Sequence, residues 1–401
     1  MSDLPNVVVA TSVDQVEALR DAWQSAGVNN LDSDIDYFLT VVRSSPSVIR
    51  PHVVCLRRPG MPDLFGIARL EDFPLRVAIG HRTLARPKLR GIVVTFGGIV
   101  GAAGIEEEQL ILDELERPLR TGEAEALVLR RLDCTGSQYR AAKGRGRFLL
   151  CVHGQVVVHR WTAEKPETLE AFLNNRSAKT RQTLRRQDRR LERDHGDGLR
   201  LVRFEHADQS DELARDLETV AVRTYQRGMG VGHRGDAVER ALIELGLSRG
   251  WLRVWMLYLN GKPAAFWTGT TYAGTFTIGT PGFDPDHGRE SVGRYTMFRM
   301  LEDVFSDERI SRLDLGQGDA EYKEAFDPAR TDETDVTLLA KRPRSVALGL
   351  LSSAVLLVNG WGRRLVRDSA RGRQFEQAWR RRLTDRSSAL AKPDKPHLNQ
   401  G

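Results

Sequence analysis

The stretch from Thr275 to Phe326 most constrains what this 401-residue chain can fold into. Its pattern predicts a strand at 275–280, a loop ending at Gly293, a helix, a short strand at 313–315 and a glycine-rich turn. The first backbone N–H groups of a helix lack intrahelical partners, so this order of elements can hold a phosphate at the helix N-terminus. We interpret the rest of the chain as a frame around this unit.

The length of the chain exceeds that of one ordinary core and predicts two domains with an appendage. A hydrophobic content of 40% and a charged content of 28% are typical of a soluble globular protein. The three cysteines form no closely spaced pair, which argues against a disulfide framework or a zinc site and favours a reducing compartment. The N-terminus lacks a signal-peptide pattern, and the longest apolar run, Val346–Val358, is too short to span a bilayer. We therefore expect a cytoplasmic protein.

Positive charge is concentrated in two segments. Arg176–Arg193 carries a net charge of +6 and Lys341–Arg382 one of +9, against +6 for the whole chain, so the remainder is acidic. Such segments can attract nucleic acid, anionic lipid or an anionic substrate. The first segment predicts either a solvated inter-domain helix or a basic wall, including Arg181 and Arg185, along a substrate cleft. The second predicts an apolar helix and a basic helix, with core packing favoured over peripheral contact with an anionic membrane.

The first 165 residues predict one α/β unit. The expected elements are helices at 11–27, 34–43 and 106–120, and strands at 53–57, 65–70, 76–80, 92–96, 126–131, 148–152 and 156–161. The glycine-rich loop Gly97–Gly104 lies between a strand and a helix and can cradle a phosphate. No basic or hydroxyl residue follows it at ligand-like spacing, so a structural interpretation is favoured.

A long helix over Thr168–Arg193 leads into a second α/β unit. Its expected elements are a strand at 199–205, helices at 210–227 and 234–249, strands at 251–259, 262–272 and 274–280, and a last strand at 334–341. The pairs Asn260-Gly261 and Ala273-Gly274 separate the three middle strands. Asn-Gly between apolar runs is a strong hairpin signal, so these strands are predicted to be antiparallel.

Four segments of this second unit carry a family resemblance. They are RQTLRRQDRRL at Arg181–Leu191, LNGKPAAFWTG at Leu259–Gly269, FDPDHGRESVG at Phe283–Gly293 and LDLGQGDAEYKEAF at Leu313–Phe326. In this order they resemble the GNAT acyltransferases, and in detail the CelD/BcsL-like branch associated with cellulose and polysaccharide biosynthesis, which in turn resembles the FemAB-type transferases. The resemblance covers about 168–340.

This resemblance implies an α/β fold of two tandem GNAT-like domains with mixed, largely antiparallel sheets. Residues 1–165 are expected to form a degenerate N-terminal copy. Residues 166–341 would form the acyltransferase domain, including a basic linking helix at 168–195. Residues 342–401 would form a basic helical extension and a disordered tail.

The resemblance also implies transfer from acetyl-CoA or another acyl-CoA to a sugar or other cell-envelope precursor. The donor would contact the loop and the preceding strand; the expected residues are Gly288, Arg289, Ser291, Val292, Gly293, Ile278 and Thr280. The loop departs from the family pattern in two ways. Gly293 is followed by Arg294 and Tyr295, without the second glycine of the family pattern, and Glu290 adds a negative charge.

Acyl transfer to an amine needs a base for the ammonium group and an acid for the leaving thiolate. Tyr322, a neutral phenol at pH 7, is predicted to be the acid. Asp319 or Asp314 is predicted to act as the base or to position the acceptor, and Lys323 to bind an anionic acceptor or polarise the acyl carbonyl. Alternatively, the two aspartates cap turns and the lysine pairs with a neighbouring glutamate. His287, beside the loop, is interpreted as an exposed bystander.

Two other functions stay open. A FemAB-like transferase would use aminoacyl-tRNA, with the basic helix 176–193 following the phosphate backbone. A non-catalytic binding protein would keep the fold without a donor site. No metal site is expected under any of the three hypotheses.

Overall fold

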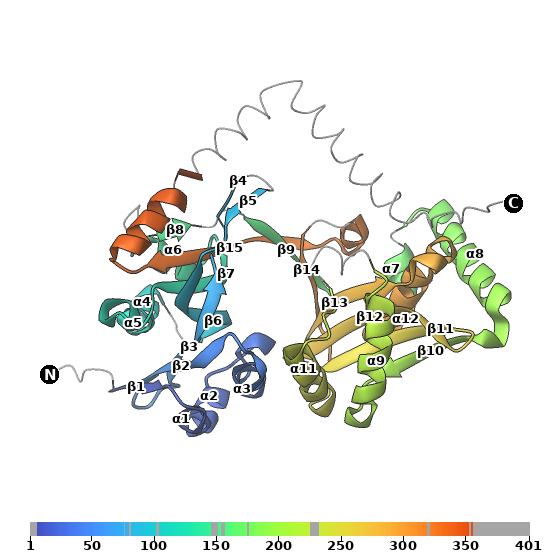
Figure 1. Cartoon of the computed structure of the whole chain (residues 1–401). Helices are drawn as coiled ribbons and strands as arrows, with labels where there is room; N and C mark the ends of the chain where they lie inside the picture. The colour runs from blue at the N-terminus through green and yellow to red at the C-terminus, as the bar shows by residue number, and fades with distance from the viewer. Residues whose placement is uncertain are drawn as a thin grey trace, which may run out of the picture.

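The computed structural model describes residues 6–75, 77–79, 82–101, 104–145, 151–153, 157–174, 176–224, 232–318, 321–352 and 354–355. Its main feature is a single mixed sheet of 13 strands that runs through two halves of the molecule (Figure 1). We call residues 6–153 the N-terminal half and residues 158–326 the C-terminal half. Within the described residues no helix is long and apolar enough to cross a membrane.

The strands follow the order β1-β2-β3-β6-β7-β15-β9-β14-β13-β12-β11-β10, with β8 also paired to β15. Their bounds are β1 Asn6–Ala10, β2 Val48–Arg57, β3 Leu64–Pro74, β6 Lys88–Val100, β7 Ala126–Asp133, β8 Cys151–His153, β9 Val158–Glu164, β10 Leu199–Phe204, β11 Leu252–Leu259, β12 Lys262–Tyr272, β13 Thr275–Phe283, β14 Arg312–Gln317 and β15 Ala329–Leu339. A separate hairpin joins β4 Val77–Ile79 and β5 Arg82–Ala85. Among the described strands, β6 pairs with β7 and β13 with β14 in parallel, whereas the other neighbours are antiparallel.

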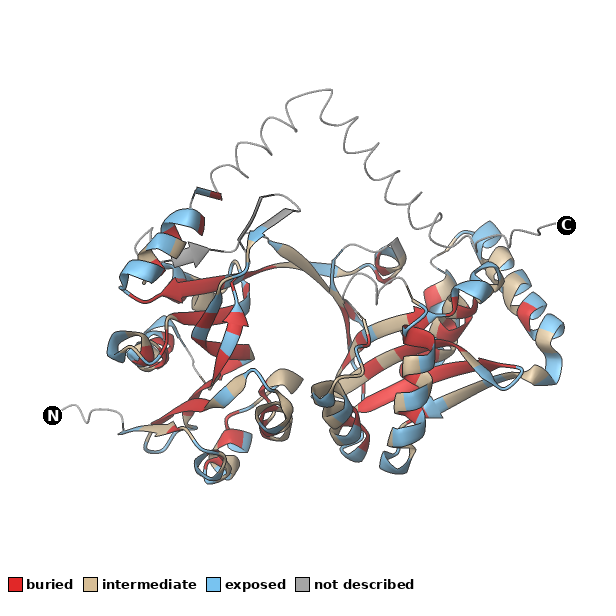
Figure 2. Cartoon of the chain, viewed as in Figure 1, coloured by how far each residue is buried: buried red, intermediate tan, exposed pale blue. Residues whose placement is uncertain are grey.

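Helices lie on both sides of this sheet. In the N-terminal half they are α1 Val13–Glu17, α2 Arg20–Ser25, η1 Leu31–Ser33, α3 Ile35–Ser44, α4 Ile105–Leu115, α5 Arg117–Thr121 and α6 Ser137–Lys143. In the C-terminal half they are α7 Leu169–Asn174, α8 Ala178–His195, η2 Gly196–Gly198, η3 Ala207–Gln209, α9 Ser210–Ala221, α11 Ala237–Ser248, η4 Pro285–Glu290, α12 Val292–Ser306 and η5 Glu321–Phe326. Each half buries its own apolar side chains, and the buried residues concentrate on the strands in Figure 2.

Strands β9 and β15 connect the halves. The first part of β15 pairs with β9, from Ala329↔Thr162 to Glu333↔Val158, and the second part pairs with β7, from Glu333↔Asp133 to Leu339↔Ala126. β9 in turn pairs with β14. The sheet is therefore continuous across the predicted boundary at residue 165. The last strand of the predicted second domain, β15, is hydrogen-bonded to strands of the predicted first domain.

Two further contacts join the halves away from the sheet. The hydroxyl of Tyr272 donates to Asp34 at 2.9 Å, and the guanidinium of Arg249 pairs with Asp36. Both aspartates belong to the start of α3, which packs against α11. The hairpin containing Tyr272 thus also forms an inter-half contact.

The turn predictions for the second unit are confirmed. Asn260 and Gly261 both have positive φ, at 51° and 77°, and Ala273 and Gly274 have φ of 44° and 76°. These values define type I′ turns, whose twist matches that of antiparallel strands.

The prediction of one long helix over 168–193 is wrong, because the segment forms two helices. α7 ends at Asn174, and α8 begins after Ser177, whose hydroxyl accepts from the backbone N–H of Thr180 at 3.1 Å. This N-cap fixes a new helix start, since its φ and ψ of −57° and 148° are not helical. α8 is also no inter-domain helix, because it lies on the outer side of the C-terminal half (Figure 1).

The glycine-rich segment 97–104 also differs from its prediction. Gly97 to Val100 belong to β6, so the loop is shorter than expected. The sequence also gave no indication of α6. Residues 343–352 are helical and continue from β15, whereas the predicted basic helix after residue 356 lies outside the described residues.

Candidate active site at the divergence of β13 and β14

The two central strands of the C-terminal half separate soon after they begin. β13 and β14 pair over Thr275↔Arg312, Phe276↔Leu313 and Thr277↔Asp314, although β13 continues to Phe283 and β14 to Gln317. Beyond Thr277, this edge of β13 has no strand partner among the described residues. A parallel pair that diverges in this way leaves backbone donors and acceptors available to an extended ligand.

A bulge in β13 shapes this divergence. Its register with β12 shifts between Gly269↔Ile278 and Trp267↔Pro281, which places one additional residue in β13. The hydroxyl of Thr268 holds the bulge by accepting from the Thr280 backbone N–H at 2.8 Å. A Cβ at Gly279 would lie 2.3 Å from that hydroxyl, so only glycine permits this close approach. The predicted donor residues Ile278 and Thr280 therefore lie at the divergence, with Ile278 buried.

The loop after β13 leads directly into the N-terminus of α12. The N-cap, Ser291, has a left-handed backbone with φ of 61°, and its carbonyl accepts from the Tyr295 backbone N–H at 3.0 Å. Gly288 and Gly293 have no packing requirement, because a Cβ at either would meet only Phe283 at 3.5 Å or more. Arg289 is exposed and forms no ion pair with any described residue. The first turn of α12 contains no acidic residue, so its N–H groups can receive an anion.

The carboxylate of Glu290 is turned toward two histidines. It lies 2.5 Å from Nε2 of His195, at the end of α8, and 3.1 Å from Nδ1 of His287. Burial opposes ionisation, but these hydrogen bonds lower the pKa of Glu290. His287, predicted to be a bystander, therefore helps to hold the loop against α8.

The glycine turn after β14 is fixed from two sides. Asp314 is buried, accepts from the Gly316 backbone N–H at 2.9 Å, and pairs with the guanidinium of Arg160. Lys323 is also buried, and its ammonium donates to the carbonyls of Gly316, Gln317 and Gly318 at 3.0, 2.9 and 2.8 Å. For Asp314 these contacts agree with the alternative of a turn cap, and for Lys323 they show a contact with the turn that neither of its predicted roles named.

Tyr322 lies beside Trp267, near the start of α12. Its side chain is half-buried, burial raises its pKa, and its hydroxyl forms no hydrogen bond with any described residue. Its ring packs edge-on against Trp267, with the centroids 6.0 Å apart. The indole N–H of Trp267 donates to the Gly293 carbonyl at 2.8 Å. Trp267 thus contacts both the start of α12 and Tyr322.

The predicted substrate arginines of α8 differ from each other. Arg181 is half-buried and donates to the backbone carbonyls of Asn174 and Arg176 at 3.2 and 2.8 Å, across the break between α7 and α8. Arg185 is exposed. α8 lies beside α12, because Arg294 bonds to Gln187 and pairs with Asp188 at 3.6 Å. The sequence did not predict that Arg294 would join α12 to α8, because a single arginine carries no pattern that identifies its partner.

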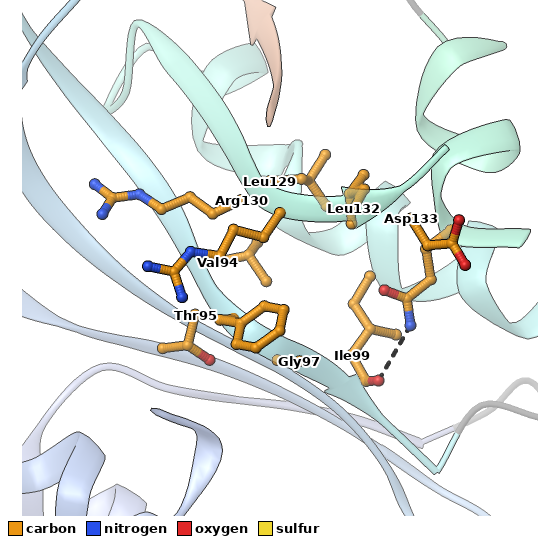
Figure 3. Close-up of a pocket in the computed structure, with 12 residues that line it drawn as sticks. Val94, Thr95, Gly97, Ile99, Leu129, Arg130, Leu132 and Asp133 are labelled. Atoms are coloured by element: carbon orange, nitrogen blue, oxygen red, sulfur yellow. Dashed lines mark hydrogen bonds between the residues drawn. The ribbon is translucent and has the colours of Figure 1, made fainter. Parts of the chain in front are cut away.

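The N-terminal half contains a second divergence of the same kind. β6 and β7 pair in parallel from Gly91↔Ala126 to Val94↔Leu129 and then separate. A cavity of about 110 Å³ lies between them, lined by Val94, Thr95 and Ile99 on β6 and by Leu129, Arg130 and Leu132 on β7 (Figure 3). The helix that follows β6 starts with three acidic residues, Glu106, Glu107 and Glu108. Negative charge at a helix N-terminus disfavours phosphate, so the described start of α4 does not suit a pyrophosphate.

The family model described as "Acetyltransferase (GNAT) domain" matches residues 178–324. This range begins in α8 and includes the divergent strands, the start of α12 and Tyr322. The predicted GNAT-type fold class is confirmed. No curated protein matches the chain. The CelD/BcsL-like assignment stays a prediction.

Among solved structures, the crystal structure of FemX matches with a TM-score of 0.56 and 9% sequence identity, over 86% of this chain and 100% of that chain. A tandem GNAT protein from the clavulanic acid biosynthesis pathway matches with a TM-score of 0.48 and 12% identity, over 84% and 99%. A conserved protein of unknown function from Bacteroides thetaiotaomicron matches with a TM-score of 0.49 and 12% identity, over 83% and 100%. At these identities, the likeness to FemX concerns the fold alone.

Proposed function

We propose that this protein is an acyltransferase that uses acetyl-CoA or another acyl-CoA as donor and an amine or hydroxyl group as acceptor. The observation that carries this proposal is that three features lie close together. These are the open edge of β13 after Thr277, the acid-free start of α12, and the protonated phenol of Tyr322. The match to an acetyltransferase domain covers all three.

Each feature suits one part of an acyl-CoA. The amide groups of an extended pantetheine chain can pair with the open edge of β13 beside Ile278 and Thr280. The pyrophosphate can bind the N–H groups of Val292 and Gly293, with Arg289 supplying positive charge. No Cβ at Gly288 or Gly293 hinders this approach.

Tyr322 would donate its proton to the thiolate of coenzyme A as the thioester bond breaks. A buried phenol with a raised pKa keeps that proton at neutral pH, and general acids of this kind contribute about 10²–10⁴ in rate. Asp314 and Lys323 would position Tyr322 by fixing the turn before it. Asp319, predicted as a base, lies outside the described residues and remains a candidate.

Titration calorimetry of the full chain with acetyl-CoA tests this proposal. We expect micromolar binding that is weakened by Arg289→Glu. Arg140→Glu serves as the matched control, because Arg140 is exposed on α6 in the other half. Absence of binding to acetyl-CoA and to longer acyl-CoAs would contradict the proposal and favour a binding protein without a donor site.

A transferase that uses aminoacyl-tRNA is the second candidate. It is favoured by one observation, the exposed and closely spaced arginines of α8, which include Arg185, Arg186 and Arg189. Salt-dependent binding of tRNA that is lost in Arg185→Glu/Arg189→Glu would support it, because phosphate contacts release counterions. A sugar or cell-envelope precursor as the acceptor remains part of either proposal.

A further inference from the structure

The two divergent strand pairs have equivalent bulges, but different residues occupy them. In the C-terminal half, Asp314 is the last β14 residue paired with β13, and Gly316, two residues later, has φ of 74°. In the N-terminal half, Leu129 is the last β7 residue paired with β6, and Arg131, two residues later, has φ of 54°. The register with β9 or β15 shifts at the same point in each case.

Arginine at this position is unfavourable for the backbone. A positive φ costs a residue with a Cβ on the order of 1 kcal/mol, which glycine avoids. In the corresponding strand of the C-terminal half, the residue with positive φ is a glycine, Gly316. The Asp335 carboxylate holds this backbone conformation by accepting from the Arg131 N–H at 2.8 Å, and the guanidinium takes no part in that contact.

The bulge brings two consecutive arginines to one side. Neighbouring residues of a regular strand point to opposite faces, whereas Arg130 and Arg131 both line the cavity between β6 and β7. Arg130 is labelled in Figure 3. Arg130 pairs with Glu71 at 3.3 Å. Arg131 forms no ion pair with any described residue, and its guanidinium lies 5.3 Å from the centre of the Phe96 ring.

Further charged groups surround this place. Arg160, from β9, lies over the same Phe96 ring at 4.5 Å and pairs with Asp314 before the glycine turn of the candidate active site. Asp32, on η1, forms no hydrogen bond through its side chain with any described residue. Burial raises the pKa of Asp32, and Arg131, Arg69, Arg160 and Arg130 oppose that shift. The site therefore offers a guanidinium that forms no ion pair, and a carboxyl group that accepts no hydrogen bond, with the described residues.

We infer that Arg130 and Arg131 bind an oxyanion, a phosphate or carboxylate group, at the cavity between β6 and β7. Guanidinium groups match both oxyanions with paired N–H donors. The cavity of about 110 Å³ has room for a group of a few non-hydrogen atoms. Asp32 would accept from hydroxyl or ammonium groups beside the oxyanion.

The oxyanion would belong to the acceptor, and this point rests on the proposed acyltransferase function. The two sites are connected through Arg160, which contacts Phe96 on one side and Asp314 on the other. The acidic start of α4 argues against a second acyl-CoA in this half. The acceptor class is thus a small hydroxylated or amino compound with one phosphate or carboxylate group.

Calorimetry of the full chain with inorganic phosphate, and separately with acetate, tests this inference without acyl-CoA. We expect Arg131→Gly to weaken binding of the preferred anion at least tenfold, the loss of one charged hydrogen-bonding contact. Glycine adopts the observed φ, so the fold should be kept. Arg130→Gln provides a second variant. Arg117→Gln, an exposed site in the same half, should bind as the unaltered chain does.

Equal binding by Arg131→Gly and the unaltered chain would overturn the inference. So would binding lost in Arg289→Glu but kept in Arg131→Gly, since the anion would then occupy the start of α12. A preference for phosphate over acetate, or the reverse, identifies the acceptor group. Anion binding that depends on Arg131 in a chain that binds no acyl-CoA would uphold this site while contradicting the proposed function.

Discussion

The two halves repeat one structural unit, a parallel strand pair that diverges before a helix, but they differ where chemistry depends on charge. α12 begins with Val292, Gly293 and Arg294, whereas α4 begins with Ile105 followed by three glutamates. The bulge of β14 contains Gly316, whereas that of β7 contains Arg131. The proposals above assign the donor to one copy of the unit and recognition of a second molecule to the other.

Removal of the Tyr322 hydroxyl should have the largest effect. The proposed proton donation to the leaving thiolate depends on this hydroxyl, so its loss should slow the chemical step. We expect Tyr322→Phe to lower kcat by about 10²–10⁴ and to leave acyl-CoA affinity unchanged, as measured by steady-state kinetics and calorimetry. Tyr139→Phe, in the other half, is the control. Full turnover by the Tyr322 variant would remove the proposed acid.

The halves should also lose stability in different pH ranges. His52, in the N-terminal half, is buried beside Arg50, and burial lowers its pKa to about 4. The unfolded chain binds a proton at His52 near pH 6.5 and the folded chain does not, so stability falls as pH drops from about 6.5 to 4. Linkage gives a loss of about 3 kcal/mol across this range, which His52→Gln should reduce.

In the C-terminal half the buried histidine has a carboxylate partner. His233 lies 3.0 Å from Glu239. Burial opposes ionisation, but hydrogen bonds from His233 and from backbone N–H groups lower the pKa of Glu239 to about 2. Its contribution to stability is therefore lost between about pH 4.5 and 2. Urea unfolding at several pH values separates the two ranges. If the free energy of unfolding of His52→Gln changed with pH above 4.5 as steeply as that of the unaltered chain, the assignment of this range to His52 would be contradicted.

A glutamate introduced at the start of α12, as found at the start of α4, tests whether the charge at the two helix starts determines donor binding. Gly293→Glu places a carboxylate in the first turn of α12, and we expect acyl-CoA affinity to fall about tenfold in calorimetry. Glu106→Gly in α4 should leave that affinity unchanged. Equal effects of the two variants would mean that the halves do not differ in donor binding.

Substitutions in the two bulges should have the smallest effect, a change in stability. Gly316→Ala should destabilise the protein by about 1 kcal/mol, because a Cβ at φ of 74° is strained although nothing lies within 4 Å of it. For Arg131→Gly, the free energy of unfolding should be unchanged or higher by up to about 1 kcal/mol, because relief of backbone strain offsets the lost contact with Phe96. Urea unfolding measures both. A large loss of stability in Arg131→Gly would mean that the arginine is retained for folding.

Local sequence signals predicted the order of elements well where one dipeptide or periodicity controls the backbone. Asn260-Gly261 and Ala273-Gly274 fixed the hairpins, because their positive φ values are accessible to few residues. The order of strand, loop, helix and glycine turn around Gly293 and Tyr322 was also evident. Such signals depend on neighbours in the chain and need no knowledge of tertiary contacts.

The sequence by itself therefore determined the α/β class, the unit at 275–326 and the candidate acid Tyr322. Only the tertiary structure decided the contacts of Asp314 and Lys323, since their partners, Arg160 and the turn carbonyls, become available when β9 and β14 pair. It also decided that β15 joins both halves, and that Arg130 and Arg131 share one cavity. These features arise from pairings between residues distant in sequence, and the residues themselves carry no local pattern that specifies them.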